Sequence, residues 1–569
     1  MRRGMLERLG REDGAIAVLA SVLLLISLVS SAFAVDIGSV VLEQREARKV
    51  ADLAALDAVQ VFAGGFADTQ AGAEQLALDS AASNDFVPGG DRTLVTHVGR
   101  WDAETGSFSA GTVAANAVRV VASDTVGFNF MPGGRTISVT AVASTENLAG
   151  IAIGTGLAAL DSSESALLNP LLGALLGTSL SLTAVHYNGL ADLDVPIGVL
   201  ATHLGVGAGG IDELLATEVS VKSLARAFAD ANPDTLGAGA EALGVLAGLA
   251  TNQAQNNRFA LGEILTVATG FVTGDAAADA EVNALTMLMA AAQAANMNNA
   301  VDLNVGFALP SLTGGTLASS TMRLVVIEPP QIAIGPARME GGEWVTVARS
   351  AQVRLRVRTA VDLTTSLLGG LLPATIQLPL YVDAAQGEAA LTANHCGDPG
   401  QMTTAVTTGG VNLRIADPTD SQLASGAAPS GPAKLVTLRA NVLLLGTINV
   451  ADVFASANAT VAAGGGDLAF TGPFDWDNVE QLSATSHPKG LLLSSLNVTH
   501  TLLGSSLLSW ILSAVTSTVT NVIAPLTDQL LNILYDDVVN PTLSLLGAEL
   551  ATADVTAWHQ DCGPRVLVQ

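Results

Sequence analysis

A chain of 569 residues is long enough for several domains and a sizeable buried core. Apolar residues make up 49% of the chain but aromatic residues only 4%, so we expect a core built from many small contacts. The formal net charge of −27 argues against nucleic acid as a partner, because phosphate binding requires a basic surface. The acidic excess instead suits the solubility of an extracytoplasmic surface.

Near the N-terminus, residues 15–35 form an uncharged, mostly apolar stretch. As a helix it would rise ~31 Å, enough to cross a hydrocarbon core of about 30 Å. Basic residues lie before the stretch at Arg2, Arg3, Arg8 and Arg11, and after it at Arg45, Arg48 and Lys49. This balance slightly favours an N-terminus inside the cell. We predict a single-pass protein of the cytoplasmic membrane, with a cytoplasmic start (1–14), the bilayer as partner of residues 15–35, and an extracytoplasmic C-terminal region.

The helical pattern continues beyond the apolar stretch as a narrow stripe of small residues. Its members recur at helical spacing, and Gly64 and Gly65 end the pattern. We predict one helix over 15–63, ~70 Å long, whose second half offers a seam for close helix packing. Two hypotheses remain open, packing against an assembly partner and packing against the protein's own sheet. The candidate seam consists of Ala47, Val50, Ala51, Ala54, Ala58 and Val61.

A cleavable signal peptide is the alternative to a retained anchor. Ala32-Phe33-Ala34 has the small-x-small pattern of a signal-peptidase site. The uncharged run is longer than the usual apolar region of a signal peptide, about 7–15 residues, and the helical pattern crosses the supposed cut. We therefore favour an anchor, and keep as the alternative function a secreted or surface adhesion module released after Ala34.

The same region carries a family resemblance. Residues 10–18 read GREDGAIAV, Asp36-Ile37-Gly38 follows the apolar run, and residues 51–58 read ADLAALDA. This order resembles the N-terminal segment of TadG-like proteins of tight-adherence (Flp) pilus assembly. The resemblance implies a membrane-anchored, pilin-like structural component whose partners are other pilus-assembly or pilin-like proteins. A prepilin leader would place Glu five residues after a cut at Gly14, and Leu19 stands there instead.

The remaining chain is expected to complete an α+β fold. A second helix over 66–85 and strands over 92–100, 113–122 and 135–146 predict a small pilin-like α/β region at 64–150. Residues 151–300 are Ala/Gly-rich and predicted to be helical, including a helix capped by Asp275 that runs to Met297. Alternating patterns predict a β-rich domain at 301–569. A late amphipathic helix within 501–527 is expected to stop before Pro525.

Three short patterns could carry binding chemistry, and each has a structural alternative. Arg354, Arg356 and Arg358 share one face of a predicted strand; they could dock an acidic partner, but acidic neighbours across the sheet are the favoured interpretation. Asp161, Ser163 and Ser165 fit the metal-site pattern of von Willebrand A-type domains, whereas a helix N-terminus is the favoured interpretation. The FDWDNVE run (474–480) resembles a calcium loop without its glycine, and an ordinary turn is expected.

The two cysteines, Cys396 and Cys562, are predicted to form one disulfide outside the cytoplasm. A zinc site with His395 and His559, or free thiols, are the alternatives, and no C-x-x-C pattern supports zinc. The sequence contains no nucleophile elbow, metalloprotease motif or phosphate loop. We therefore expect a non-enzyme with no catalytic residues, resident metal or cofactor; the small-molecule ligand, if any, is undetermined by the sequence.

Overall fold

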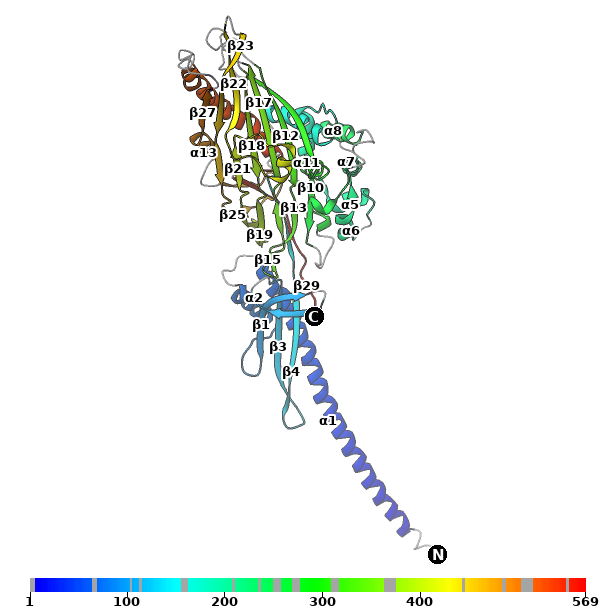
Figure 1. The fold of residues 1–569 in the computed structure, drawn as a ribbon. Helices are drawn as coiled ribbons and strands as arrows, with labels where there is room; N and C mark the ends of the chain where they lie inside the picture. Colours follow the sequence, from blue (N-terminus) through cyan, green and yellow to red (C-terminus); the bar gives the residue numbers. More distant parts are fainter. Residues whose placement is uncertain are drawn as a thin grey trace. The chain divides into compact units, whose positions relative to one another are not determined.

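The computed structural model divides the chain into two compact units: Met1–Glu146 with Cys562–Gln569 (unit 1), and Asn147–Asp561 (unit 2). The fold is α+β, with a long N-terminal helix, a small sheet, a helical middle and a β-rich C-terminal half, as predicted (Figure 1). The finer borders at residues 14, 63, 150 and 300 stay predictions. The structure describes residues 6–63, 69–102, 105–111, 115–154, 162–206, 210–233, 237–248, 257–268, 277–308, 317–362, 375–442, 446–483, 488–502, 515–548 and 552–569.

Unit 1 consists of a long helix, a short helix and a small antiparallel sheet. α1 (Leu6–Ala58) crosses the candidate cleavage site without a break and ends in a 3-10 turn, η1 (Val59–Ala63). α2 (Thr69–Ser83) follows and packs against α1 and β1. The last residues of the chain complete the sheet, whose order is β2-β1-β3-β4-β29. Its strands are β1 Thr93–Asp102, β2 Ser107–Ala110, β3 Ala117–Gly127, β4 Gly134–Ser144 and β29 Val566–Leu567.

The C-terminal half of α1 lies along β3 and β4, with the tip of their hairpin toward the N-terminal end of the helix (Figure 1). The contacts fix this direction. Near the tip, Val40 shares a small buried cluster with Ile137 and Val139. Further along both elements, Ala51 and Ala54 share the main core of unit 1 with residues of β3 and β4. From its tip to its base, the hairpin therefore runs alongside α1 in the direction that leads away from the predicted membrane span.

Unit 2 contains a six-stranded sheet of order β11-β12-β17-β18-β21-β24, a five-stranded sheet β26-β28-β5-β13-β9, a four-stranded sheet β16-β19-β20-β25 and a three-stranded sheet β22-β23-β27. Most neighbours are antiparallel, and β9 with β13 is a parallel pair. The strands are β5 Asn147–Ile153, β9 Leu265–Val267, β11 Ala300–Ala308, β12 Leu317–Glu328, β13 Ile332–Pro336, β16 Val347–Arg349, β17 Gln352–Asp362, β18 Thr375–Ala384, β19 Glu388–His395, β20 Gln401–Thr407, β21 Val411–Arg414, β22 Ala433–Val442, β23 Gly446–Ser456, β24 Asn458–Val461, β25 Gly465–Thr471, β26 Val479–Ser483, β27 Asn497–Leu502 and β28 Thr552–Cys562.

Short strand pairs and helices make up the rest of unit 2. The pairs are β6 (Asp194–Pro196) with β10 (Glu281–Asn283), β7 (Glu218–Val219) with β8 (Phe259–Ala260), and β14 (Met339–Glu340) with β15 (Glu343–Trp344). The helices are α3 Ser162–Leu175, α4 Ala184–Ala191, α5 Ile197–His203, α6 Ile211–Ala216, α7 Val221–Ala231, α8 Ala238–Ala247, η2 Leu261–Glu263, α11 Ala284–Ala294, α12 Asp420–Ser425, α13 Pro488–Ser494, η5 Val519–Ile523, α15 Ala524–Leu534, η6 Tyr535–Val539 and α16 Asn540–Leu545.

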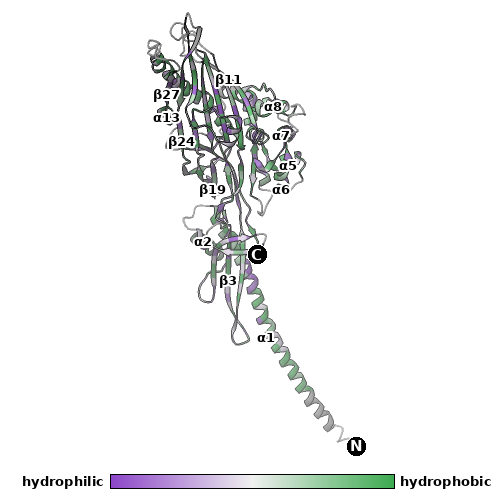
Figure 2. Ribbon diagram, in the orientation of Figure 1, coloured by the Kyte–Doolittle hydropathy of each residue, from purple (hydrophilic) through white to green (hydrophobic). Residues whose placement is uncertain are grey.

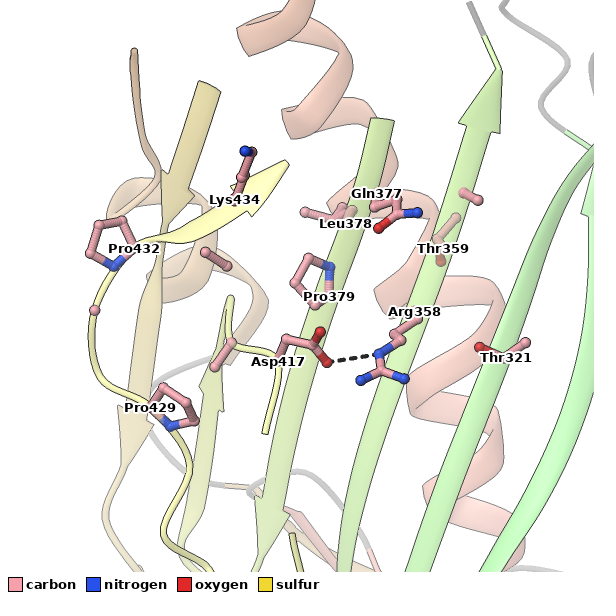
Figure 3. A pocket seen from close by; sticks show the side chains of 14 residues that line it. Thr321, Arg358, Thr359, Gln377, Leu378, Pro379, Asp417, Pro429, Pro432 and Lys434 are labelled. Atoms are coloured by element: carbon pink, nitrogen blue, oxygen red, sulfur yellow. Dashed lines mark hydrogen bonds and ion pairs between the residues drawn. The ribbon is translucent and has the colours of Figure 1, made fainter. Parts of the chain in front are cut away.

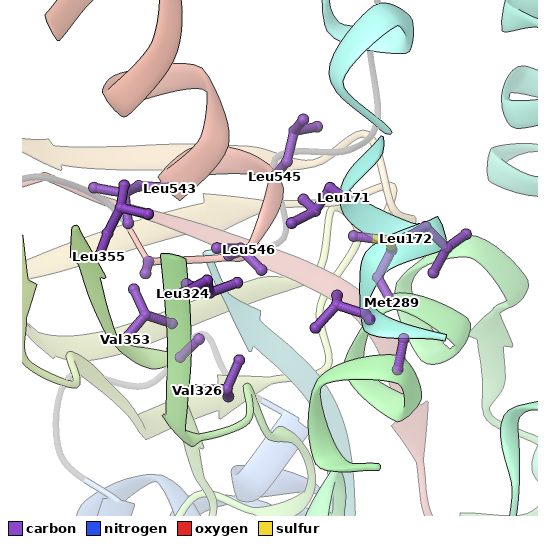
Figure 4. Packing of buried hydrophobic residues seen from close by; sticks show 14 of the residues in the cluster. Leu171, Leu172, Met289, Leu324, Val326, Val353, Leu355, Leu543, Leu545 and Leu546 are labelled. Carbon is purple, nitrogen blue, oxygen red and sulfur yellow. The ribbon is translucent and has the colours of Figure 1, made fainter. Parts of the chain in front are cut away.

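One face of the six-stranded sheet carries the main core of unit 2. Side chains that alternate along β12 and β17 point into it, among them Leu324 and Leu355, and α3, α11 and α16 contribute Leu171, Met289 and Leu543 to the same cluster (Figure 4). The period of two residues along each strand puts every second side chain on this face. The intervening side chains lie on the opposite face; they include polar residues such as Arg354 and a smaller buried cluster with Val325 and Tyr381.

The predicted helix from Asp275 to Met297 is wrong in its bounds. Its described helical residues are 277–278 and, after a break, α11 (Ala284–Ala294). Asn283 caps α11 by accepting a hydrogen bond from the backbone N–H of Thr286 at 3.1 Å. The preceding residues Glu281–Asn283 form β10 because they pair with β6. Asp275 lies outside the described residues.

The predicted end of the late helix before Pro525 is also wrong. Thr501 and Leu502 belong to β27, and residues 503–514 lie outside the described residues. The helix then passes through Pro525, which stands in the first turn of α15 after the π-helical segment η5. A wider turn leaves room for the proline ring and does not need its missing N–H, so the helix continues to Leu534.

Candidate functional site: the N-terminal helix and unit 1

The first half of α1 is an apolar helix with no cover. Residues 16–62 include a stretch long and apolar enough to cross a membrane, and none of its best window is buried. The apolar side chains between Ile16 and Val35 are exposed, and the same stretch is green in Figure 2. Water would be an unfavourable surrounding for this surface, whereas lipid would not. The helix thus has the properties of a single membrane span.

Directly after this stretch, α1 carries a buried carboxylate. Asp36 is 0% exposed. Its Oδ1 accepts a hydrogen bond from the backbone N–H of Asn129 at 2.7 Å, and its Oδ2 accepts one from the N–H of Met131 at 2.9 Å. The N–H of Phe130 lies 3.2 Å from both oxygens. Three successive amides of the hairpin tip thus donate hydrogen bonds to one carboxylate.

The hairpin tip spans residues 128–133 between β3 and β4. It is closed by a hydrogen bond from the backbone N–H of Phe128 to the carbonyl of Gly133, at 3.0 Å. Phe128 is half-buried and packs against the cluster of Val40 and Ala47. Phe130, by contrast, is 66% exposed. The tip is therefore held to α1 from two sides while one aromatic ring stays uncovered.

All six residues of the candidate seam are buried within unit 1, and most of them belong to its main core cluster. α2 faces them with Ala73, Ala77 and Ala81, and the sheet contributes Val118 and Val120 to the same cluster. Small side chains on both helices allow this close approach. The structure thus places the stripe against the protein's own α2 and sheet, which is the internal one of the two packing hypotheses.

The surroundings of the two cysteines are joined by hydrogen bonds between strand ends. Cys396 directly follows β19, and Cys562 is the last residue of β28. Two residues before Cys562, the side chain of Gln560 donates hydrogen bonds to Asn394 Oδ1 at 2.6 Å and to the carbonyl of His395 at 3.2 Å. Neither cysteine is free. These contacts bring the two strand ends together.

Each arginine of the predicted row forms an ion pair with an aspartate of the same chain. Arg354 lies 3.3 Å from Asp383 on β18, the adjacent strand. Arg356 and Arg358 pair with aspartates at the start of α12 and just before it, at 3.1 and 2.7 Å. The row is therefore neutralised internally, in line with the favoured interpretation, although most of the acidic partners come from a segment over the sheet and not from a neighbouring strand.

A pocket of about 420 Å³ lies beside this row. Arg358 and its partner Asp417 line it together with Thr321, Gln377 and Lys434 (Figure 3). Its opposite wall is the Pro-rich segment with Pro429 and Pro432. Arg358 and Asp417 neutralise each other, and Lys434 pairs with Asp452 at 2.6 Å, so the lining offers no converging set of groups for chemistry.

The other candidate patterns do not assemble a site in the described residues. α3 begins at Ser162, so the serines of the DSSES segment fall in the first turn of a helix, while Asp161 lies outside the described residues. In FDWDNVE, the backbone N–H of Asp477 donates to Asp475 Oδ1 at 3.1 Å, which is a turn contact. Among the residues described, no group of three or more His, Cys, Asp or Glu could hold a metal.

His559 lies beside an aromatic stack and not beside metal ligands. Trp476 stacks on Trp558 with ring centroids 4.9 Å apart, and the ring of His559 follows at 5.8 Å from that of Trp558. Burial lowers the pKa of His559, and the nearby carboxylates, Asp561 first among them, oppose this shift. Burial likewise raises the pKa of Asp194. In both groups burial thus shifts the protonation equilibrium toward the neutral form.

The sequence does not predict the contact of Asp36 with the hairpin. In the sequence, Asp36 is singled out only as part of the Asp-Ile-Gly motif of the family resemblance, which assigns no role to its side chain. The available signal is its isolation, because it is the one charged residue between Asp13 and Glu43. A lone carboxylate at the end of an apolar helix must find donors, and the sequence does not say where they come from.

Three family models match the chain. A Flp pilus-assembly TadE/G-like model (Tad) matches residues 14–61, and a Tad-like Flp pilus-assembly model (Tad_C) matches residues 44–143. A domain of unknown function (DUF8293) matches residues 164–293. No curated protein and no solved structure matches the chain significantly. The first two matches together cover residues 14–143, which hold most of α1 and of unit 1, so the N-terminal region of the chain is TadG-like, of the Flp pilus-assembly families.

Proposed function

We propose that the protein is a membrane-anchored, pilin-like structural component of a tight-adherence (Flp) pilus-assembly system. The observation that carries this proposal is the coincidence of two features. The residues that match the pilus-assembly models, 14–61 and 44–143, are the exposed apolar helix and the small unit packed on its second half. A long helix with a lipid-compatible first half and a sheet on its second half suits lateral assembly in a bilayer.

The anchor spans the cytoplasmic membrane with its N-terminus inside, and units 1 and 2 lie outside the cytoplasm. Residues 15–35 contact lipid. The basic residues before the span support this orientation. The acidic surface of the remaining chain and the proposed disulfide between Cys396 and Cys562 suit the same compartment.

The partners are other pilus-assembly or pilin-like proteins. The seam from Ala47 to Val61 is occupied by α2 and the sheet, so assembly contacts use surfaces other than the seam. The role is structural and not enzymatic, since the matched families are assembly components. No catalytic residue and no cofactor belongs to the proposal.

The test combines three measurements on the full chain in its native cells. Membrane fractionation and intact mass establish whether the N-terminal helix is retained, and protease accessibility in spheroplasts establishes the orientation. A photo-crosslinking residue at lipid-exposed Leu24 is expected to capture a membrane or pilus-assembly protein, whereas one at Val87, exposed in unit 1, serves as the comparison. A mature chain that begins at Val35 and is released would overturn the proposal in favour of the secreted module.

A further inference from the structure

The apolar surface of α1 does not end where the uncharged stretch ends. Asp36 is the one charged residue between Asp13 and Glu43, and its carboxylate is withdrawn from the surface by the hairpin tip. Beyond it, Ile37 is 55% exposed and Leu42 is 64% exposed. The surface that α1 presents is therefore free of charge up to Leu42.

The length of this surface matches a whole bilayer better than its core alone. Residues 15–35 account for ~31 Å of helix, and residues 36–42 add ~10 Å. A hydrocarbon core is about 30 Å thick, and the headgroup regions bring the total to roughly 40–45 Å. If the first stretch fills the core, Asp36 stands at the border between acyl chains and headgroups, and Leu42 near the outer limit of the headgroups.

The contacts of Asp36 then fix the height of the hairpin tip. Because the amides of residues 129–131 bind the Asp36 carboxylate, the tip lies level with this border. The strands rise from the tip in the same direction as α1, since Val40 meets Ile137 and Arg48 reaches the carbonyl of Thr140. The tip is consequently the part of this hairpin that lies nearest the membrane.

The composition of the tip suits that position. Residues 125–134 carry no charged side chain, and Phe130 is uncovered next to the partly exposed Met131. Arg135 follows on the exposed edge of β4, where a guanidinium can reach lipid phosphates. The nearest ion pair of β3, Arg92 with Asp124 at 2.9 Å, lies further up the sheet. Apolar and aromatic side chains at the border, with basic groups just outside, are typical of membrane-interface anchors.

We infer that the β3–β4 hairpin tip is a second, interfacial membrane contact, in which Phe130 and Met131 enter the headgroup–acyl border of the bilayer that α1 spans. Asp36 is the positioning residue that holds the tip at that depth. The exposed ring of Phe130 contacts lipid and not a second copy of the chain, because it lies level with the continuous lipid-facing surface of α1. The inference rests on the proposed membrane anchoring.

The experiment measures depth with tryptophan and brominated lipids. The full chain is placed in vesicles of phosphatidylcholine with one-fifth phosphatidylglycerol, with or without bromine at acyl positions 6 and 7. Three variants each add one tryptophan to the native five: Phe130→Trp at the tip, Leu25→Trp in the middle of the span, and Phe108→Trp in β2. Phe108 lies at the far end of the sheet, because β2 pairs with the end of β1 that is opposite to the tip.

Bromine is expected to quench roughly half of the added emission of Phe130→Trp, most of that of Leu25→Trp, and none of that of Phe108→Trp. Quenching of Leu25→Trp with an unquenched Phe130→Trp would overturn the inference and leave the anchor intact. A blue-shifted Phe130→Trp emission that bromine does not quench would identify a protein contact and likewise overturn it. Loss of quenching at Leu25 would instead show that α1 does not enter the bilayer, so that the proposed function fails and this inference with it.

Discussion

Removal of the Asp36 carboxylate should release the β3–β4 hairpin while the rest of unit 1 stays folded. In Asp36→Ala, the amides of Asn129, Phe130 and Met131 lose their acceptor. Hydrogen bonds to a charged group contribute about 1.5–3 kcal/mol each when measured singly. The three hydrogen bonds share one carboxylate, so their contributions do not add fully. We expect a loss of about 2–4 kcal/mol in the free energy of hairpin opening.

Hydrogen exchange measures this loss directly. At a tenfold change per 1.4 kcal/mol, the amides of 128–133 should exchange roughly 30- to 700-fold faster in Asp36→Ala. Asp36→Asn retains one acceptor oxygen without the charge and should lie between the alanine variant and the native protein. The core amides of β3 near Val120 should change little, because the cluster around Ala54 is untouched.

Ser39→Ala is the matched control. Among the described residues, its hydroxyl bonds to the backbone carbonyl of Asp36 within the same helix, at 2.8 Å. This variant alters the same turn of α1 but leaves the three hairpin contacts in place, so exchange at the tip should stay at the native rate. Equal exchange rates at residues 128–133 in the native protein and in Asp36→Ala would refute the reasoning. Equal acceleration in Asp36→Ala and Ser39→Ala would refute it as well.

Three further outcomes are expected. Ala54→Arg places a charge into the core of unit 1 and should lower its free energy of unfolding by about 3–5 kcal/mol, which rapid proteolysis of unit 1 would reveal. Gln44→Arg adds the same side chain on the exposed side of α1 and should leave the rate of digestion unchanged. Cys396 and Cys562, which we propose to be bonded to each other, should resist alkylation in non-reduced protein from native cells, and labelling of both would contradict the pairing. Burial lowers the pKa of folded His559 below its unfolded value of about 6.5. The stability that depends on neutral His559 is therefore complete above that pH and is lost as the pH falls. The midpoint of urea unfolding should drop between roughly pH 7 and pH 5, and His559→Gln should reduce this pH dependence.

Much of this fold could be predicted because its signals are local. The apolar run and the small-residue stripe of α1 follow from helical periodicity, and the alternating pattern around Arg356 follows from the pleat of a strand. Burial of the stripe against its own sheet was one of two hypotheses that periodicity alone could not separate. The choice depends on α2 and β3, which the chain supplies after α1 and which cover the same face.

One wrong prediction concerns a place where distant pairing outweighs local preference, and the other concerns a local departure from α-helical geometry. Residues before α11 read as a helix start, but β6 recruits Glu281–Asn283 as a strand across a long stretch of sequence. Pro525 read as a helix end, but η5 widens the preceding turn and removes the clash. In the first case the deciding partner is not visible in a window of ten or fifteen residues. In the second case the deciding feature is the π-helical turn directly before Pro525, which helical periodicity does not distinguish from an α-helical turn.

Asp36 illustrates how such a long-range contact can still leave a local trace. Without the hairpin, the Asp36 carboxylate would expose a charge on a helix whose apolar surface continues for nearly two more turns. This charge would limit how deeply the helix can sit in the bilayer. The hairpin removes this limit by supplying three backbone donors, so the same contact both satisfies the charge and fixes one end of the sheet. A glutamate side chain in its place would reach past the amides, and an apolar side chain would leave them without an acceptor. The length of the side chain is therefore specified as closely as its charge, and Asp36→Glu should open the hairpin nearly as much as Asp36→Asn does.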